Sequence, residues 1–191
     1  DPVEHLDIVF GLAERHPVGV DIHLHETGEL GAFTFELIAE RTSAMGMQGK
    51  VTISHAFSLS SVDAARQAAL VELLAVNDIA LTTVAPGNRE PLPLDALRAA
   101  GVRVGLGQDG IRDYWSPYGN GDVLERAWQL AFRSGVRYDD AIEQCVDMAS
   151  RGGRAVVDGG PWSTDPMRDD ARSGLAVRAP AELVVVAADT V

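Results

Sequence analysis

Four short apolar runs recur along the first two thirds of the chain, and longer stretches with helical spacing of their apolar positions separate them. These runs are Val18–Leu24, Lys50–Ser54, Ile79–Val84 and Val102–Leu106. Each is apolar enough to be buried on both faces, which is typical of strands in a parallel sheet. The pattern therefore predicts an α/β fold.

Helices are predicted between and after these strands. The expected helices are Pro2–Glu14, Leu30–Met45, Ser61–Val76, Leu94–Ala100, Asp122–Arg133 and Asp139–Ser150. Gly46, Asn77 and Gly101 directly follow three of them, at the position where helices commonly end. The chain from Gly152 to Ala179 is rich in Gly, Pro, Asp and Arg and predicts loop, and Glu182–Ala187 predicts one isolated strand.

The spacing of the strands limits the choice of architecture. Their midpoints recur at roughly 30 residues, the length of one strand-helix unit. No Gly-x-Gly-x-x-Gly motif follows any strand, which argues against a nicotinamide-binding sheet. A (β/α)8 barrel typically needs about 250 residues, and four units make half of one. We therefore expect residues 1–160 to be the C-terminal half of a TIM-type barrel whose N-terminal half is missing from this chain, and 161–191 to be a loop and a strand.

Composition excludes several classes of partner. The 191 residues include 16 Lys and Arg against 28 Asp and Glu, and the net charge of −12 argues against binding nucleic acid through its phosphates. The apolar run Leu183–Ala188 is far shorter than the roughly 20 residues that span a bilayer, and no export signal is visible. The single cysteine, Cys145, excludes an internal disulfide. These features predict a cytoplasmic protein without a membrane partner.

Ionisable residues follow the predicted strands at their carboxyl ends. His23 and His25 lie at the end of the first strand, His55 directly follows the second, and Asp109 follows the fourth. In a parallel barrel these positions share one rim, where active sites of this fold are built. His23 and His55 are one repeat apart, and His55 and Asp109 are two. We therefore expect all three to point at a common centre.

Imidazoles and a carboxylate around one point suit a divalent zinc, iron or manganese ion. Such an ion lowers the pKa of water towards 7, while a nearby carboxyl group carries the proton. Glu26, three residues after His23, is placed for that role. Taken singly, a histidine at a strand end is more often a surface residue, and Asp-Gly is a common turn. Because four suitable residues share one end of consecutive units, we predict a metal site.

The motifs at these positions resemble those of a known family. The strings are Val20–His23 with Glu26, Ser54-His55, Gly107–Asp109 and Trp115–Gly119. They are similar to the C-terminal half of cytosine deaminase and its relatives in the amidohydrolase superfamily, and the similarity covers most of the chain. The closing segment, from Gly174 to Val186, resembles the point where such enzymes leave the barrel and enter a small accessory β-sandwich.

The resemblance implies a role for each site residue. His23 and Asp109 would bind the single divalent metal, and Asp109 would also accept a proton from the attacking water. His55 would help polarise the attacked carbon. Glu26 would protonate the neighbouring ring nitrogen and return a proton to the leaving amine. Trp115 resembles an aromatic residue that helps to wall the substrate pocket, although a large residue that packs a long loop is an alternative interpretation.

Two departures from the family's pattern affect these expectations. The family's His-x-His pair belongs to the first barrel strand, which this chain lacks, and Glu26 places His23 in the later motif, so His25 is not predicted as a ligand. Gly110 stands where cytosine deaminase is expected to carry a second acid that contacts the substrate. Its loss points to isocytosine, another aminated pyrimidine, a triazine or a related heterocycle.

The leading hypothesis is a metal-dependent hydrolytic deaminase that acts on a small aminated N-heterocycle. The alternatives are another amidohydrolase reaction, such as opening a cyclic amide or removing an alkylamine from a triazine, and a non-catalytic or incomplete fragment that lacks the N-terminal metal ligands. A half-barrel alone would expose two sheet edges and an apolar face, which predicts self-association into a homo-oligomer.

Two further predictions concern packing. Cys145 lies inside a predicted helix without a basic neighbour in sequence and is expected to be a buried, unreactive thiol. Trp128 and Phe132 are four residues apart on one helical face, and this spacing predicts that both pack against the barrel.

Overall fold

A computed structural model describes residues 1–158 of the chain. Its sheet contains four parallel strands in the order in which they occur in the sequence. The strands are β1 (Val20–Leu24), β2 (Val51–His55), β3 (Ile79–Thr83) and β4 (Val104–Leu106). The predicted α/β fold with consecutive parallel β/α units is therefore confirmed.

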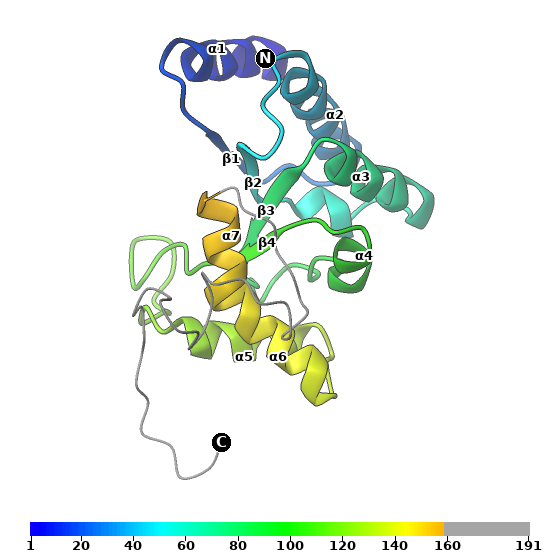
Figure 1. Ribbon diagram of the computed structural model, residues 1–191. Coiled ribbons are helices and arrows are strands. Elements are labelled where there is room, and N and C mark those ends of the chain that lie inside the picture. Colours follow the sequence, from blue (N-terminus) through cyan, green and yellow to red (C-terminus); the bar gives the residue numbers. More distant parts are fainter. Residues whose placement is uncertain (159–191) are drawn as a thin grey trace, which may run out of the picture.

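Seven α-helices surround the sheet in the described part of the chain (Figure 1). They are α1 (Pro2–Arg15), α2 (Gly28–Ala44), α3 (Ala64–Val76), α4 (Leu94–Ala99), α5 (Val123–Arg133), α6 (Asp139–Asp147) and α7 (Gly153–Asp158). Aspartates at 1, 63 and 122 accept hydrogen bonds from the first free backbone N–H groups of α1, α3 and α5. Such N-caps explain where these helices begin.

The structure differs from the sequence prediction at two places along these elements. A short 3-10 helix, η1 (Phe57–Ser60), follows β2 where no element was predicted, and α3 begins at Ala64, three residues after the predicted start at Ser61. The predicted helix Asp139–Ser150 ends at Asp147, continues as the π-helix η2 (Met148–Gly152) and leads into α7, where a loop was expected. A Cβ atom on Gly152 would lie 2.7 Å from the Val104 carbonyl oxygen, so the missing side chain lets η2 approach β4 closely.

The two faces of the sheet differ in polarity. In β1, buried Val20, Ile22 and Leu24 alternate with exposed Asp21 and His23. The apolar positions of neighbouring strands stand side by side, and they join the core together with apolar residues of the helices. The core therefore fixes the register of the strands, because a shift by one residue would turn these side chains to the opposite face.

A line of hydrogen-bonded side chains crosses the polar face. The Ser54 hydroxyl donates to the Asp21 carboxylate over 2.7 Å and lies 2.7 Å from the Thr82 hydroxyl. These residues belong to β1, β2 and β3 and form a polar layer beneath the carboxyl ends of the strands.

The last helix packs against the far edge of the sheet. Buried Arg103 donates to the carbonyl oxygen of Ala155 in α7 and to the Asp78 carboxylate, with both distances at 3.0 Å. This guanidinium joins the start of β4 to the turn before β3 and to α7, which lies beside β4 in Figure 1.

Within residues 1–158, no helix combines the length and the apolar character that a membrane span requires. The predicted strand Glu182–Ala187 and the accessory β-sandwich lie outside the described residues. The same holds for the proposed boundary between 1–160 and 161–191.

Candidate functional site

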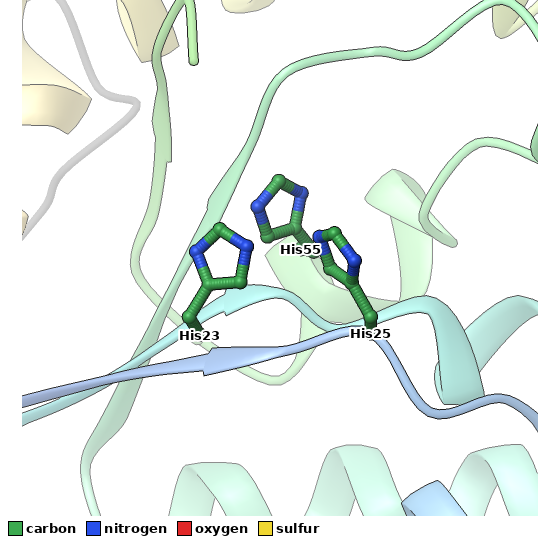
Figure 2. A group of neighbouring side chains, drawn as sticks. All are labelled: His23, His25 and His55. Atoms are coloured by element: carbon green, nitrogen blue, oxygen red, sulfur yellow. The ribbon is translucent and has the colours of Figure 1, made fainter. Parts of the chain in front are cut away.

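Three histidine rings meet at the carboxyl ends of β1 and β2 (Figure 2). The ring centroids of His23 and His55 are 4.2 Å apart, those of His25 and His55 are 4.3 Å apart, and those of His23 and His25 are 4.5 Å apart. Each ring offers one nitrogen, and the three nitrogens lie within 4.8 Å of one another. The arrangement is a compact group of imidazole donors, which we call the histidine cluster.

The geometry of the strands brings these three side chains together. His23 and His25 are two residues apart, so their side chains leave the chain on the same side. His55 pairs with Leu24, the residue between them, in the ladder of β1 and β2. The backbone at His55 has a φ of 72°, and this left-handed conformation breaks the alternation of β2 at the strand's last residue. The ring of His55 therefore reaches the two rings from β1.

His55 is the most deeply enclosed member of the cluster, with 4% of its side chain exposed. Burial is the main cause that lowers its pKa to about 4, and the nearby imidazoles of His23 and His25 lower it further. The carboxylates of Asp109 and Asp21 act in the opposite direction. At neutral pH His55 is therefore uncharged and carries a nitrogen lone pair. Its Nδ1 atom is buried and has no hydrogen-bond partner among residues 1–158.

Asp109 lies beside His55 and comes from the opposite edge of the sheet. It follows β4, and its Oδ2 atom lies 3.9 Å from Nε2 of His55. The backbone φ of Asp109 is 60°, a left-handed conformation that is rare outside glycine. Half of its carboxylate is exposed to solvent. The structure thus places Asp109 beside His55, whereas the donor atoms that lie within 4.8 Å of one another are those of the three histidines.

The segments that follow β1 and β2 are joined to each other. The Gly28 amide donates to the Ser61 hydroxyl over 2.8 Å, and the Ser58 hydroxyl donates to the Gly28 carbonyl over 3.1 Å. Gly31 allows α2 to approach closely, because a Cβ atom there would lie 2.7 Å from Cβ of Ser58 and would clash with the carbonyl of Glu26. These contacts hold the ends of the two histidine-bearing strands in one relative position.

Glu26 and Trp115 stand apart from these contacts. Glu26 lies in the turn between β1 and α2, and its exposed carboxylate makes no hydrogen bond or ion pair within the described residues. Trp115 lies in the loop after β4 and is 94% exposed, although its amide donates to the Asp113 carboxylate over 2.9 Å. Packing of the Trp115 loop by its indole is therefore not observed in the described part of the chain. The proposed roles of both residues stay predictions.

His25 is the member of the cluster that sequence reasoning missed. The argument from the motif assigned His23 and set His25 aside. The signal that could have found it was the two-residue spacing, because alternate residues of a strand share one side.

The donor set of the site fits a divalent metal ion. Neutral imidazoles together with a carboxylate are common ligands of zinc, iron and manganese. The unpartnered, buried Nδ1 atom of His55 also indicates that this site is built for a ligand beyond the described residues, because a buried nitrogen without a partner is costly.

Comparison with known proteins agrees with this geometry. The profile of the amidohydrolase family matches residues 2–190. The chain belongs to the amidohydrolase family. The resemblance inferred from the sequence motifs is therefore confirmed at the level of the superfamily.

Among solved amidohydrolase structures, N-isopropylammelide isopropylaminohydrolase from Burkholderia multivorans is 46% identical in sequence, with a TM-score of 0.80 over 83% of this chain and 40% of that one. The 5-methylcytosine deaminase from Klebsiella pneumoniae, liganded with 5-fluorocytosine, is 25% identical, with a TM-score of 0.75 over 94% of this chain and 44% of that one. The pterin deaminase of Rhizobium rhizogenes is 30% identical over 96% of this chain and 42% of its own length.

This amidohydrolase chain spans between 27% and 42% of the length of the curated relatives that it matches. The solved relatives are likewise covered only in part. Together with the four consecutive parallel strands, this coverage confirms that the fold is part of an amidohydrolase TIM-type barrel.

Proposed function

We propose that this chain supplies the metal-binding, proton-transferring part of an amidohydrolase that removes an amino group from a small N-heterocycle by hydrolysis. The observation that carries the proposal is the cluster of His23, His25 and His55 at the carboxyl ends of the strands, with Asp109 next to His55. The relatives support the substrate class, because those with assigned activities are named for reactions on an ammelide, a pterin and a methylcytosine.

In this proposal His23 and Asp109 bind one divalent ion, either zinc or iron, with manganese as a further candidate. His25 and His55 offer additional imidazole nitrogens at the same point. A divalent ion at this place would supply the Lewis acidity that lowers the pKa of water to about 7.

The proton transfers of the proposed reaction are carried out by side chains of this chain. Water adds to the ring carbon that bears the amino group, and the Asp109 carboxylate accepts a proton from that water. The Glu26 carboxyl group donates a proton to the adjacent ring nitrogen. The bond between carbon and the exocyclic nitrogen then breaks, the amine leaves with a proton that Glu26 relays, and a ring carbonyl remains. General acid-base transfer of this kind contributes about 10²- to 10⁴-fold to a rate.

His55 has a separate role in the proposal. Nε2 of its uncharged ring lies 3.9 Å from Oδ2 of Asp109. The ring can donate a hydrogen bond to, or accept one from, the group bound to the carbon that water attacks. Trp115 would cover the heterocycle from the loop after β4.

One specific observation favours a second candidate reaction. The chain is 46% identical to an enzyme named for removing isopropylamine from N-isopropylammelide. The same residues could release an alkylamine from a triazine, because the bond that breaks has the same chemistry and only the substituent on nitrogen differs. Opening of a cyclic amide is a further alternative, since it needs the same attack by water.

Amine release from purified protein tests these reactions against one another. Cytosine, isocytosine, a pterin and an N-alkylated ammelide would be assayed for ammonia and for alkylamine, before and after chelation and after zinc or iron is restored. Metal-dependent ammonia release supports deamination, and alkylamine release supports the second candidate. Stoichiometric metal without either amine would contradict both, and absence of bound metal would favour a non-catalytic fragment.

A further inference from the structure

An arginine stacks on an aromatic ring that lies beside the histidine cluster. Phe57, in η1, lies directly after the end of β2, and its ring centroid is 5.3 Å from that of His55 and 5.4 Å from that of His25. The guanidinium carbon of Arg89 stands 5.4 Å from the centroid of the same Phe57 ring. The Phe57 ring therefore contacts both the histidine cluster and the permanently charged guanidinium of Arg89.

The donors of this guanidinium are not committed elsewhere in the described chain. Within residues 1–158 the side chain of Arg89 makes no ion pair and donates no hydrogen bond, although the acidic Glu90 is its neighbour. Arg41, Arg66, Arg103 and Arg151, in contrast, each pair with a carboxylate. In a protein with a net charge of −12, an exposed arginine without an acidic partner among the described residues is available to a ligand.

The loop that carries Arg89 is held in place from α5. Arg126 donates to the carbonyl of Val84 over 3.2 Å, and Gln129 donates to the carbonyl of Ala85 over 3.0 Å. Arg133 donates to the carbonyl of Arg89 itself over 2.5 Å. These three donors lie three and four residues apart, so they project from one face of the helix.

The far end of the same loop is fixed as well. The Ser60 hydroxyl, from the end of η1, donates to the Pro91 carbonyl over 2.6 Å. The loop between β3 and α4 is thus bound to α5 on one side and to the segment of Phe57 on the other. These bonds fix the backbone at Arg89, and its exposed guanidinium lies over the Phe57 ring.

Phe57 and Arg89 together offer a defined chemistry at the edge of the site. An aromatic ring packs against a planar heterocycle, and a guanidinium presents several donors in a rigid fork that suits oxygen acceptors and negative charge. Because the guanidinium lies outside the cluster, it would meet the edge of the ligand that points away from the reacting carbon.

We propose that Arg89, stacked on Phe57, is a specificity-determining residue that selects heterocycles with carbonyl oxygens or a negative charge on the edge remote from the histidine cluster. This inference rests on the proposed function, because it names the substrate class of the same site. It predicts discrimination against rings that carry amino groups at these positions.

Two pyrimidines that differ only in their substituents provide the test. Barbituric acid carries three oxo groups and is an anion at neutral pH, whereas 2,4,6-triaminopyrimidine carries three amino groups on the same ring. Their dissociation constants would be measured by calorimetry on the purified protein loaded with zinc. Wild-type protein is expected to bind barbiturate at least about tenfold more tightly than the triamine, and Arg89→Met should weaken barbiturate binding about 10- to 100-fold without weakening binding of the triamine.

Two further variants make the result specific. Arg98→Met removes an exposed arginine at the end of α4 and should not alter barbiturate binding. Phe57→Leu should weaken both pyrimidines to a similar extent, because the ring contributes stacking and not charge. Circular dichroism would check that each variant is folded.

Several outcomes would overturn the inference. These are equal affinity of the wild type for both pyrimidines, an Arg89→Met variant that binds barbiturate normally, an equal loss in Arg98→Met, and no binding of either compound. The proposed function is judged separately by amine release. If the protein binds barbiturate through Arg89 but releases no amine, this inference stands and the proposed function is contradicted.

Discussion

Nε2 of His55 lies 3.9 Å from Oδ2 of Asp109, although β3 stands between the strands that end near these two residues. The backbone at both residues is left-handed, with φ angles of 72° and 60°. Non-glycine residues hold this conformation at a cost and concentrate at functional sites. The pair therefore shows that the chain accepts backbone strain to aim two side chains at one point.

Alanine substitutions in the histidine cluster are expected to weaken metal binding. His23→Ala and His55→Ala should each weaken zinc binding by at least about tenfold, because each removes an imidazole from the donor group. Metal content after dialysis and competition with a chromogenic chelator would measure the loss. His5→Ala, on the surface of α1, is the matched control. Normal metal content in both cluster variants would contradict the assigned site.

His25→Ala decides whether the third imidazole is a ligand. A loss as large as that of His23→Ala would add His25 to the metal-binding residues. If the metal content is unchanged and substrate binding is weakened, His25 contacts the substrate instead.

Glu26→Gln should separate binding of the metal from turnover. The carboxamide keeps the size of the side chain but cannot carry the proton, so kcat should fall about 10²- to 10⁴-fold. Metal content should stay that of the wild type, because Glu26 is not a proposed ligand. Glu29→Gln, in the first turn of α2, provides the control and should retain activity. A fully active Glu26→Gln variant would remove this residue from the mechanism.

Gly31→Ala should destabilise the protein and disturb the site together. The new methyl group would clash with the Glu26 carbonyl and stand 2.7 Å from Cβ of Ser58. Overpacking of this kind costs about 1–3 kcal/mol, which urea unfolding would measure. Gly11→Ala, inside α1, meets only the end of the flexible Arg15 side chain at 3.5 Å and should stabilise by up to about 1 kcal/mol. If Gly31→Ala leaves the urea midpoint of unfolding unchanged, the close packing of Gly31 against Ser58 and the Glu26 carbonyl is contradicted.

Cys145 should react slowly with thiol reagents while the protein is folded. The side chain is buried, and this burial raises the pKa of the thiol, so less thiolate is present at a given pH. Labelling with a chromogenic disulfide at pH 8 should be at least about tenfold slower than after unfolding in urea. Equal rates in the two states would show that the residue is accessible.

Much of this fold could be predicted from local patterns. The strands were predictable because each is a short run rich in apolar, β-branched residues that joins the core. Cys145 was expected to be buried because it lies inside a helix without a basic neighbour in sequence, and it is buried. Trp128 and Phe132 were expected to pack against the barrel, and this prediction was wrong for the described residues. Both side chains are exposed, and their rings stack on each other with centroids 5.6 Å apart.

The candidate site was predictable where it depended on the ends of strands. His23 lies beside His55, and His55 lies beside Asp109, because parallel strands place their carboxyl ends at one edge. The two-residue spacing could have placed His25 beside His23, but the approach of His55 to both rings depends on its left-handed backbone. The place of Arg89 depends on hydrogen bonds from α5 to a loop that is distant in sequence, and no periodic pattern predicts these contacts.

The hydrogen bonds that fix the loop of Arg89 all reach main-chain oxygens, at Val84, Ala85, Arg89 and Pro91. A different amino acid at position 89 would thus inherit the same place beside Phe57, since the anchoring atoms exist in every residue type. In the proposed role of Arg89, exchange of that one side chain would change which heterocycles bind, while the histidine cluster stays untouched.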